Sequence, residues 1–207
     1  MYYLNSLPHD VEKINLSRLG LTELPDLSRF YNLKGINCSY NMLTELPELP
    51  LLTYLDCSVN KLTVLPELPL LTLLDCSNNQ LTLLPELPLL TDLYCYNNKL
   101  SVLPEMPNLI RLGCSYNKLS VLPEMPNLIR MGCSNNPIHY IIGNDIKKLR
   151  LLQRFRHLYF SLKYKGRFVD WLWEKVRKPK IEQMYHPSRL IEFIDGSDNW
   201  DERLDDW

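Results

Sequence analysis

Residues 71–89 read LTLLDCSNNQLTLLPELPL, and variants of this 19-residue unit fill most of the chain. The unit contains one cysteine, and an asparagine follows it three residues later. A fixed period of about 20 residues is the signature of a solenoid, in which each turn stacks on the next. The cysteines recur at Cys38, Cys57, Cys76, Cys95, Cys114 and Cys133, and the asparagines at Asn41, Asn60, Asn79, Asn98, Asn117 and Asn136.

Each unit is expected to form one short strand that stacks in parallel on the next. Alternation along the strand sends Leu74 and Cys76 inward and leaves Leu73 and Asp75 on the open face of the sheet. In the inward slot a cysteine serves as a small apolar group, so we expect free, buried thiols and a reducing compartment. Asn79 follows the strand end, where its amide can bond backbone groups that the turn leaves unpaired. The cysteines and asparagines are therefore predicted to form a structural ladder.

Two prolines three residues apart follow the turn in most units, as at Pro85 and Pro88. Proline cannot donate a hydrogen bond to a strand ladder, and it disfavours a helix. The side of the solenoid opposite the strands is therefore predicted to be extended, with a conformation close to polyproline.

The units are less regular at the N-terminal end of the chain. Leu16 and Cys38 are separated by 22 residues, whereas the later intervals are 19 residues. Terminal repeats are commonly atypical. We therefore predict seven repeats over residues 11–138, preceded by a short N-terminal cap over residues 1–10.

A different pattern begins after Pro137. From Asp145 onward, apolar residues follow one another at steps of three and four, which is the spacing of one helical face. Asn144 or Asp145 is placed to cap the start of this helix. The further predicted segments are helices around 168–176 and 186–194, within a helical C-terminal cap over 139–194, and an acidic tail over 195–207.

The net charge of the 207 residues is −1, but the charge is unevenly distributed. Residues 147–180 carry 12 basic and 2 acidic side chains. We interpret this stretch as the soluble outer surface of the helical cap, and the alternative is a surface for nucleic acid or anionic membrane. Because no apolar run is long enough to span a membrane and no signal-peptide pattern is present, we expect an intracellular, cytoplasmic protein.

From about Val11 to Ile138 the chain resembles the leucine-rich-repeat family. Its Leu-Pro-Glu-Leu-Pro spacing is similar to the shortest subtype, which occurs in effector proteins that some bacteria inject into host cells. Similar repeats followed by a Tyr-His-Pro run, here residues 185–187, occur in proteins of giant DNA viruses of amoebae. The resemblance implies an α/β repeat solenoid: a right-handed superhelix with a parallel sheet on its concave face, an extended convex side and an α-helical C-terminal cap. It also implies a location in the host cell cytoplasm.

No catalytic constellation is visible in the sequence. The histidines at positions 9, 139, 157 and 186 are scattered, and neither a zinc-ligand spacing nor a glycine-rich phosphate loop occurs. Some related effectors carry a ligase domain with a catalytic cysteine, but no cysteine follows Cys133 here. We therefore expect no enzyme, no metal site, no cofactor and no small-molecule substrate.

The open face of the sheet, called the concave face below, is the surface that the repeat leaves free to vary. Arg111 and Arg130 are expected to converge there on an acidic group of a partner, with Gly113 and Gly132 leaving room for its approach. Aromatic residues and arginine commonly anchor interfaces, although tyrosines also favour strands for other reasons. The predicted function is recognition of another protein, and the alternative is a scaffold that binds nucleic acid or membrane through residues 147–180. The predicted binding residues are Tyr54, Asp56, Leu73, Asp75, Asp92, Tyr94, Arg111 and Arg130.

Tyrosines in the turn that follows the strands are expected to add aromatic rings to the concave face. They are Tyr40, Tyr96 and Tyr116, which we place in a single column of the repeat.

Overall fold

A computed structural model of the chain describes Leu4, residues 6–154, and the isolated positions 166, 170 and 174. Residues up to Leu151 form one compact unit. The helices predicted around residues 168–176 and 186–194 and the acidic tail fall outside the described residues, apart from those isolated positions. Within the described part of the chain, no helix has the length and apolar character that a membrane crossing needs.

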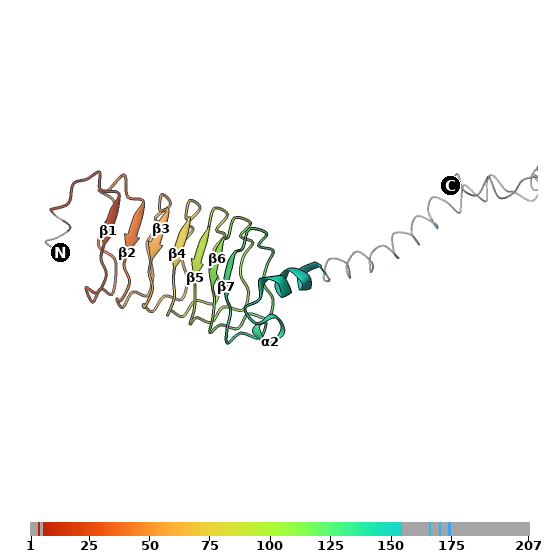
Figure 1. The fold of residues 1–207 in the computed structure, drawn as a ribbon. Helices are drawn as coiled ribbons and strands as arrows, with labels where there is room; N and C mark the ends of the chain where they lie inside the picture. The colour runs from red at the N-terminus through yellow and green to blue at the C-terminus, as the bar shows by residue number, and fades with distance from the viewer. Residues whose placement is uncertain (1–3, 5, 155–165, 167–169, 171–173, 175–207) are drawn as a thin grey trace, which may run out of the picture. The chain divides into compact units, whose positions relative to one another are not determined.

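Seven parallel strands form a single sheet in which the spatial order of the strands is their order in the sequence (Figure 1). Each strand has three residues, and one strand comes from each predicted repeat. The parallel solenoid predicted from the 19-residue period is thereby confirmed. The strands are β1 (Lys13–Asn15), β2 (Gly35–Asn37), β3 (Tyr54–Asp56), β4 (Leu73–Asp75), β5 (Asp92–Tyr94), β6 (Arg111–Gly113) and β7 (Arg130–Gly132).

Strand pairing is in strict register, so each position of the repeat becomes a row that crosses the sheet. Tyr54 pairs with Leu73, and Asp56 pairs with Asp75. Parallel strands lie about 4.8 Å apart, so the side chains of one row are near neighbours. The middle residue of each strand points inward, and Leu55, for example, is fully buried. The first and third residues of the strands make up the concave face.

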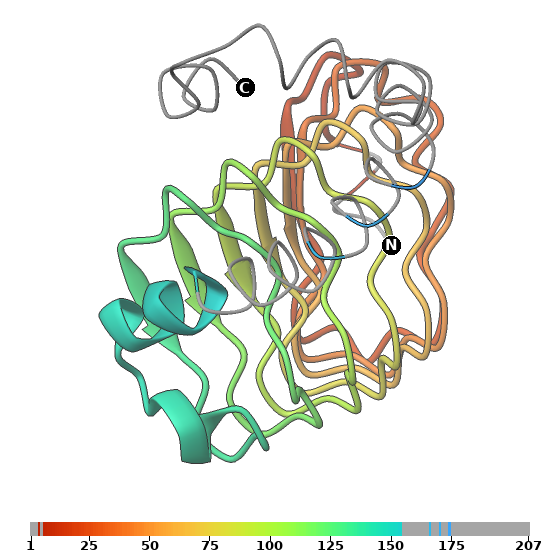
Figure 2. The ribbon, with the colours of Figure 1, turned by 90° about the vertical axis from the view of Figure 1, so that its right-hand side faces the viewer.

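The turns of the solenoid stack on one another (Figure 2), and leucines and cysteines fill the interior that they enclose. On the side opposite the strands, the Leu-Pro-Glu-Leu-Pro segments contain neither helix nor strand, as over residues 84–88. This agrees with the extended conformation that the paired prolines predict. Successive turns therefore differ little in path, which lets equivalent leucines pack directly on one another.

The asparagines after the strands bind two consecutive turns together. Asn79 Nδ2 donates to the carbonyl of Cys76 in its own turn and to that of Cys57 in the preceding turn, both at 3.0 Å. Its Oδ1 accepts a hydrogen bond from the backbone N–H of Leu62 at 3.0 Å. Asn60, Asn98, Asn117 and Asn136 repeat this arrangement, and Asn41 repeats it with Leu16 in place of the missing cysteine.

All six cysteines are buried and carry free thiols. Burial raises the pKa of Cys38 to about 12 and raises the pKa of Cys57, Cys76 and Cys95 well above the usual thiol range. Because the thiolate is the reactive form, we expect a thiol reagent at mildly alkaline pH to label few of the six in the native protein and all of them in denaturant. Mass spectrometry of the labelled chain measures this, and rapid native labelling of several cysteines would contradict their inward placement.

Substitution of one cysteine tests the same packing energetically. Cys76→Ala should lower the free energy of unfolding by about 1–2 kcal/mol, because it deletes a small core group. Cys76→Ser should cost more than Cys76→Ala, because it buries a hydroxyl without a hydrogen-bond partner. Denaturant unfolding of the two variants provides the comparison.

The C-terminal side of the last turn is covered by helical structure. The short helix α2 (His139–Ile142) ends at Gly143, which has φ 60°, and a further helix begins at Ile146 and continues to at least residue 154. Asp145 caps that helix, because its Oδ1 accepts from the backbone N–H of Lys147 at 2.8 Å. The cap predicted at Asn144 or Asp145 is thus Asp145.

Asn144 has a different role from the predicted one. Its Oδ1 accepts from the backbone N–H of Cys133 at 2.9 Å and so joins the cap to the last inward slot of the repeats. Ile142 and Leu149 are buried in the same core as the repeat leucines. These contacts attach residues 139–151 to the final repeat.

Candidate functional site

The concave face consists of two rows of side chains with different character. The first row begins with Lys13 and Gly35. It then changes from half-buried apolar residues, Tyr54 and Leu73, to a buried acid, Asp92, and to two exposed arginines. The strand register places Arg111 beside Arg130 in this row. The residues of the second row, in strand order, are Asn15, Asn37, Asp56, Asp75, Tyr94, Gly113 and Gly132.

Arg111 forms an ion pair with Asp92 on the neighbouring strand, and its Nε donates to Asp92 Oδ1. The Asp92 side chain is only 7% exposed, and the guanidinium beside it lowers the pKa of that carboxyl. Arg111 is therefore not free of partners within the chain, because it compensates a buried carboxylate. Removing Arg111 would leave Asp92 buried and unpaired, which costs stability.

Arg130 differs from Arg111 because its side chain makes neither an ion pair nor a hydrogen bond with the part of the chain that the structure describes. Its guanidinium is therefore available to an acidic group. Gly132 in the second row has open space around it, since a Cβ there would meet only Ser115 Oγ, at 3.8 Å. Gly113 is different: a Cβ would lie 3.1 Å from Tyr94 Cδ1. The Tyr94 ring uses the space over Gly113, so that glycine does not open the face to a ligand as predicted.

The tyrosines beyond the strands do not form the single column that we expected. Tyr40 and Tyr116 lie two residues after the inward cysteine, at the turn position where every repeat has positive φ. Tyr96 lies one residue after Cys95, in a row that is otherwise serine. The two kinds of tyrosine therefore belong to different rows, because one residue of offset changes the direction in which a side chain points.

A polar turn motif at the strand ends was missed by the sequence analysis. The side-chain Oδ1 of Asn15, Asn37, Asp56 and Asp75 each accepts from the backbone N–H of the serine two residues later, at 3.0 Å. This is an Asx turn, in which a short polar side chain closes the backbone. The recurring Asn/Asp-x-Ser spacing is the signal that could have revealed it. These four side chains therefore hold the strand ends, and each has a second polar atom left over.

The acidic centre of the concave face has a distinctive electrostatic environment. Asp56 and Asp75 are in register on adjacent strands. Burial, together with the charge of Asp56, raises the pKa of Asp75. Burial and both carboxylates also raise the pKa of Tyr54, so its hydroxyl stays protonated and can donate a hydrogen bond.

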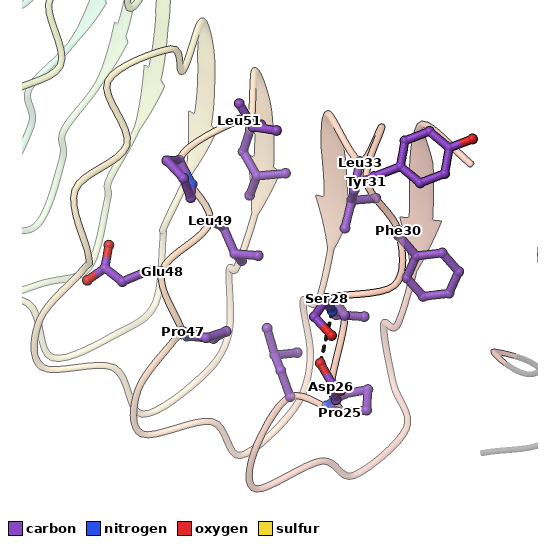
Figure 3. Close-up of a pocket in the computed structure, with 14 residues that line it drawn as sticks. Pro25, Asp26, Ser28, Phe30, Tyr31, Leu33, Pro47, Glu48, Leu49 and Leu51 are labelled. Atoms are coloured by element: carbon purple, nitrogen blue, oxygen red, sulfur yellow. Dashed lines mark hydrogen bonds between the residues drawn. The ribbon is translucent and has the colours of Figure 1, made fainter. Parts of the chain in front are cut away.

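A groove outside the sheet accompanies the longer first repeat (Figure 3). It has a volume of about 470 Å³ and lies between residues 24–33 and the Pro47–Leu52 segment of the next turn. Phe30 is buried, whereas Tyr31 is 63% exposed. Asp26 Oδ1 accepts from the backbone N–H of Ser28 at 2.9 Å and shapes the loop. The extra residues between Leu16 and Cys38 are thus accommodated at this edge, away from the strands.

No three His, Cys, Asp or Glu side chains of the described residues are placed so that they could hold a metal ion together.

Comparison with solved structures shows which proteins this solenoid resembles. YopM from Yersinia enterocolitica is 43% identical over a match that covers 61% of this chain and 29% of that one, with a TM-score of 0.57. YopM from Yersinia pestis, described as a leucine-rich effector protein, is 39% identical over 63% of this chain and 39% of that one, with a TM-score of 0.58. This chain therefore spans well under half the length of either protein. No protein-family model matches the sequence, and no curated protein matches it.

The fold and the asparagine ladder have the features of the leucine-rich-repeat class of solenoids, in agreement with these likenesses. Within that class, its repeats are similar to those of bacterial effectors.

Proposed function

We propose that this chain is a non-enzymatic recognition module that binds a partner protein on its concave face, inside a host cell. The likeness to an effector protein supports the host-cell setting. The binding surface comprises two groups on one rigid sheet, an apolar and acidic centre and a cationic end. The proposed binding residues are Tyr54, Asp56, Leu73, Asp75, Asp92, Tyr94, Arg111 and Arg130, of which Arg111 and Asp92 serve mainly to hold each other in place.

The observation that carries this proposal is the arrangement of Tyr54, Leu73 and Tyr94. They stand on three consecutive strands and are half-buried, so part of each apolar surface faces solvent. Regular strand pairing fixes their positions before any partner arrives. Preorganised aromatic groups bind with a small loss of conformational entropy, which is why they commonly anchor interfaces. An unpaired arginine, Arg130, completes the surface.

We expect Arg130→Ala to weaken partner binding at least tenfold, which is about 1.4 kcal/mol. The residue is exposed and makes no ion pair among the described residues, so the melting temperature should change little. The full chain would serve as bait in host-cell lysate, and affinity for the captured partner would then be measured for each variant. Lys118→Ala, an exposed cation outside the strands, is the matched control. Arg111→Ala is unsuitable as a test because it also uncovers Asp92.

The alternative surface lies in the basic stretch 147–180, most of which falls outside the described residues. Among the described positions, Arg150 Nη2 donates to the carbonyls of Pro126 and Leu128 at 3.2 Å, which favours the cap interpretation. Binding that survives Arg130→Ala but is abolished by removing the charges of Lys147, Lys148 and Arg154 would overturn the concave-face proposal. Binding through phosphates would also fall steeply with added salt.

A further inference from the structure

The Asx turns at the strand ends determine which polar atom each side chain presents on the concave face. In all four turns Oδ1 is engaged with a backbone N–H. In Asn15 and Asn37 the remaining atom is Nδ2, a hydrogen-bond donor. In Asp56 and Asp75 it is Oδ2, which carries negative charge. One row therefore presents two donors and then two acceptors, although all four residues make the same turn.

The two donors belong to a hollow at the N-terminal end of the concave face. It has a volume of about 370 Å³ and is lined by side chains of β1, β2 and the start of β3. Gly35 is one of its lining residues, and a Cβ there would approach Lys13 Cγ at 3.0 Å and Tyr54 Cδ1 at 3.5 Å. The glycine thus lets the Lys13 and Tyr54 side chains converge over β2. The polar side chains that line the hollow are Lys13, Asn15, Asn37 and Tyr54.

Every side chain in this polar group can donate a hydrogen bond, and none is a carboxylate. Lys13 has no ion-pair partner among the described residues, because the nearby Glu12 pairs with Lys34 at 2.6 Å. The Nδ2 atoms of Asn15 and Asn37 make no hydrogen bond within the part of the chain that the structure describes. An ammonium with three neutral donors suits a carboxylate, which can accept several charge-assisted hydrogen bonds.

The neighbouring pair Asp56 and Asp75 has the opposite requirement. Two carboxylates on adjacent strands repel each other, and a cation between them removes that repulsion. The centre of this pair lies two strands from the centre of the Asn15 and Asn37 pair, a separation of about 10 Å. A peptide in the extended polyproline II conformation advances about 3.1 Å per residue with three residues per turn, so side chains about three residues apart point to the same side and cover this separation.

We propose that the N-terminal half of the concave face binds an extended segment of a partner protein that carries an acidic residue and, about three positions along, a lysine or arginine. The acidic side chain enters the hollow beside Lys13 and the amides of Asn15 and Asn37, and the basic side chain lies between Asp56 and Asp75. This inference rests on the proposed function, since it names the kind of segment that the same face recognises.

Exchange between asparagine and aspartate provides a test that preserves the fold. Asn15→Asp with Asn37→Asp keeps the Oδ1 atoms that close the Asx turns but replaces both donors with charged oxygens. Asp56→Asn with Asp75→Asn does the reverse at the basic subsite. Gln80→Glu, a similar exchange at an exposed position outside the strands, is the matched control. Asn15→Asp with Asn37→Asp places four carboxylates in one row, where they repel one another. Lys13→Gln is therefore a second variant for the hollow, because it adds no carboxylate.

Random dodecapeptides displayed on phage and selected on the full chain are the probe. We expect the enriched peptides to share an acidic and a basic residue about three positions apart. Their affinity should fall at least tenfold in each double variant and in Lys13→Gln, and should be unchanged in Gln80→Glu. Circular dichroism melting would verify that the variants are folded.

Two results would overturn the inference in distinguishable ways. Peptides that lose affinity on Arg130→Ala, but are insensitive to the hollow and acidic-pair variants, would refute the charge pattern and leave the concave-face proposal standing. Peptides that are insensitive to all of these variants, or a failure to enrich any peptide, would refute both.

Discussion

Replacing Asn79 with Asp is expected to lower the free energy of unfolding by about 3 kcal/mol or more at neutral pH. The substitution keeps the size of the side chain but removes the donor that serves the carbonyls of Cys57 and Cys76. Each buried group left without a partner costs about 1–3 kcal/mol, and a buried carboxylate beside two carbonyl oxygens adds a further penalty.

The effect of Asn79→Asp should depend on pH in a defined direction. Burial would raise the pKa of the new carboxyl in the folded state above its value in the unfolded chain. A group of this kind destabilises the fold increasingly as pH rises through the unfolded value, so the loss should be smaller in mild acid. Denaturant unfolding at neutral pH and in mild acid measures the loss of unfolding free energy at each pH. Gln80→Glu adds the same charge one residue later, at an exposed position, and should leave stability nearly unchanged. If Asn79→Asp matches that control, the ladder does not hold the turns together.

Truncation after Ile138 is expected to abolish cooperative unfolding or to cause aggregation. The shortened chain would lose Ile142 and Leu149, which are buried at 1% and 3% exposure, and would uncover the last turn, including Leu128 and Met131. It would also leave the backbone N–H of Cys133 without Asn144. Terminal repeats need a cover, because each repeat buries its apolar face only against a neighbour.

A point substitution separates loss of the cap from loss of chain length. Leu149→Ala in the full chain should lower the free energy of unfolding by about 2–5 kcal/mol, as is usual for a buried leucine, whereas Leu151→Ala, at an exposed position, should have little effect. Size-exclusion chromatography and thermal unfolding of the truncated and substituted proteins give the comparison. A soluble 1–138 fragment that unfolds cooperatively would show that the repeats need no cover.

Much of the fold was predictable because a constant period assigns every residue to a row once the turns stack in register. The inward position of Leu74 and Cys76 follows from alternation along a strand, and that of Asn79 from its place at the strand end. Most rows of the concave face could be predicted in the same way, because residues at equivalent positions of consecutive units become neighbours on the sheet. Asp56 and Asp75 are an example. The prediction that the turn tyrosines form one row was wrong for the same physical reason. Tyr96 was counted one residue out of register, and one residue of offset changes the direction of the side chain.

The sequence by itself determined the repeat, the sheet and the composition of its open face, because these depend on backbone periodicity and on which residues are apolar. Only the tertiary structure decided how the exposed side chains pair. Arg111 reaches across to Asp92, the Tyr94 ring covers Gly113, and the Asx turns leave donors at Asn15 and Asn37 but acceptors at Asp56 and Asp75. Such contacts depend on the rotamers of long side chains between strands about 4.8 Å apart, and a linear pattern carries no information on rotamers.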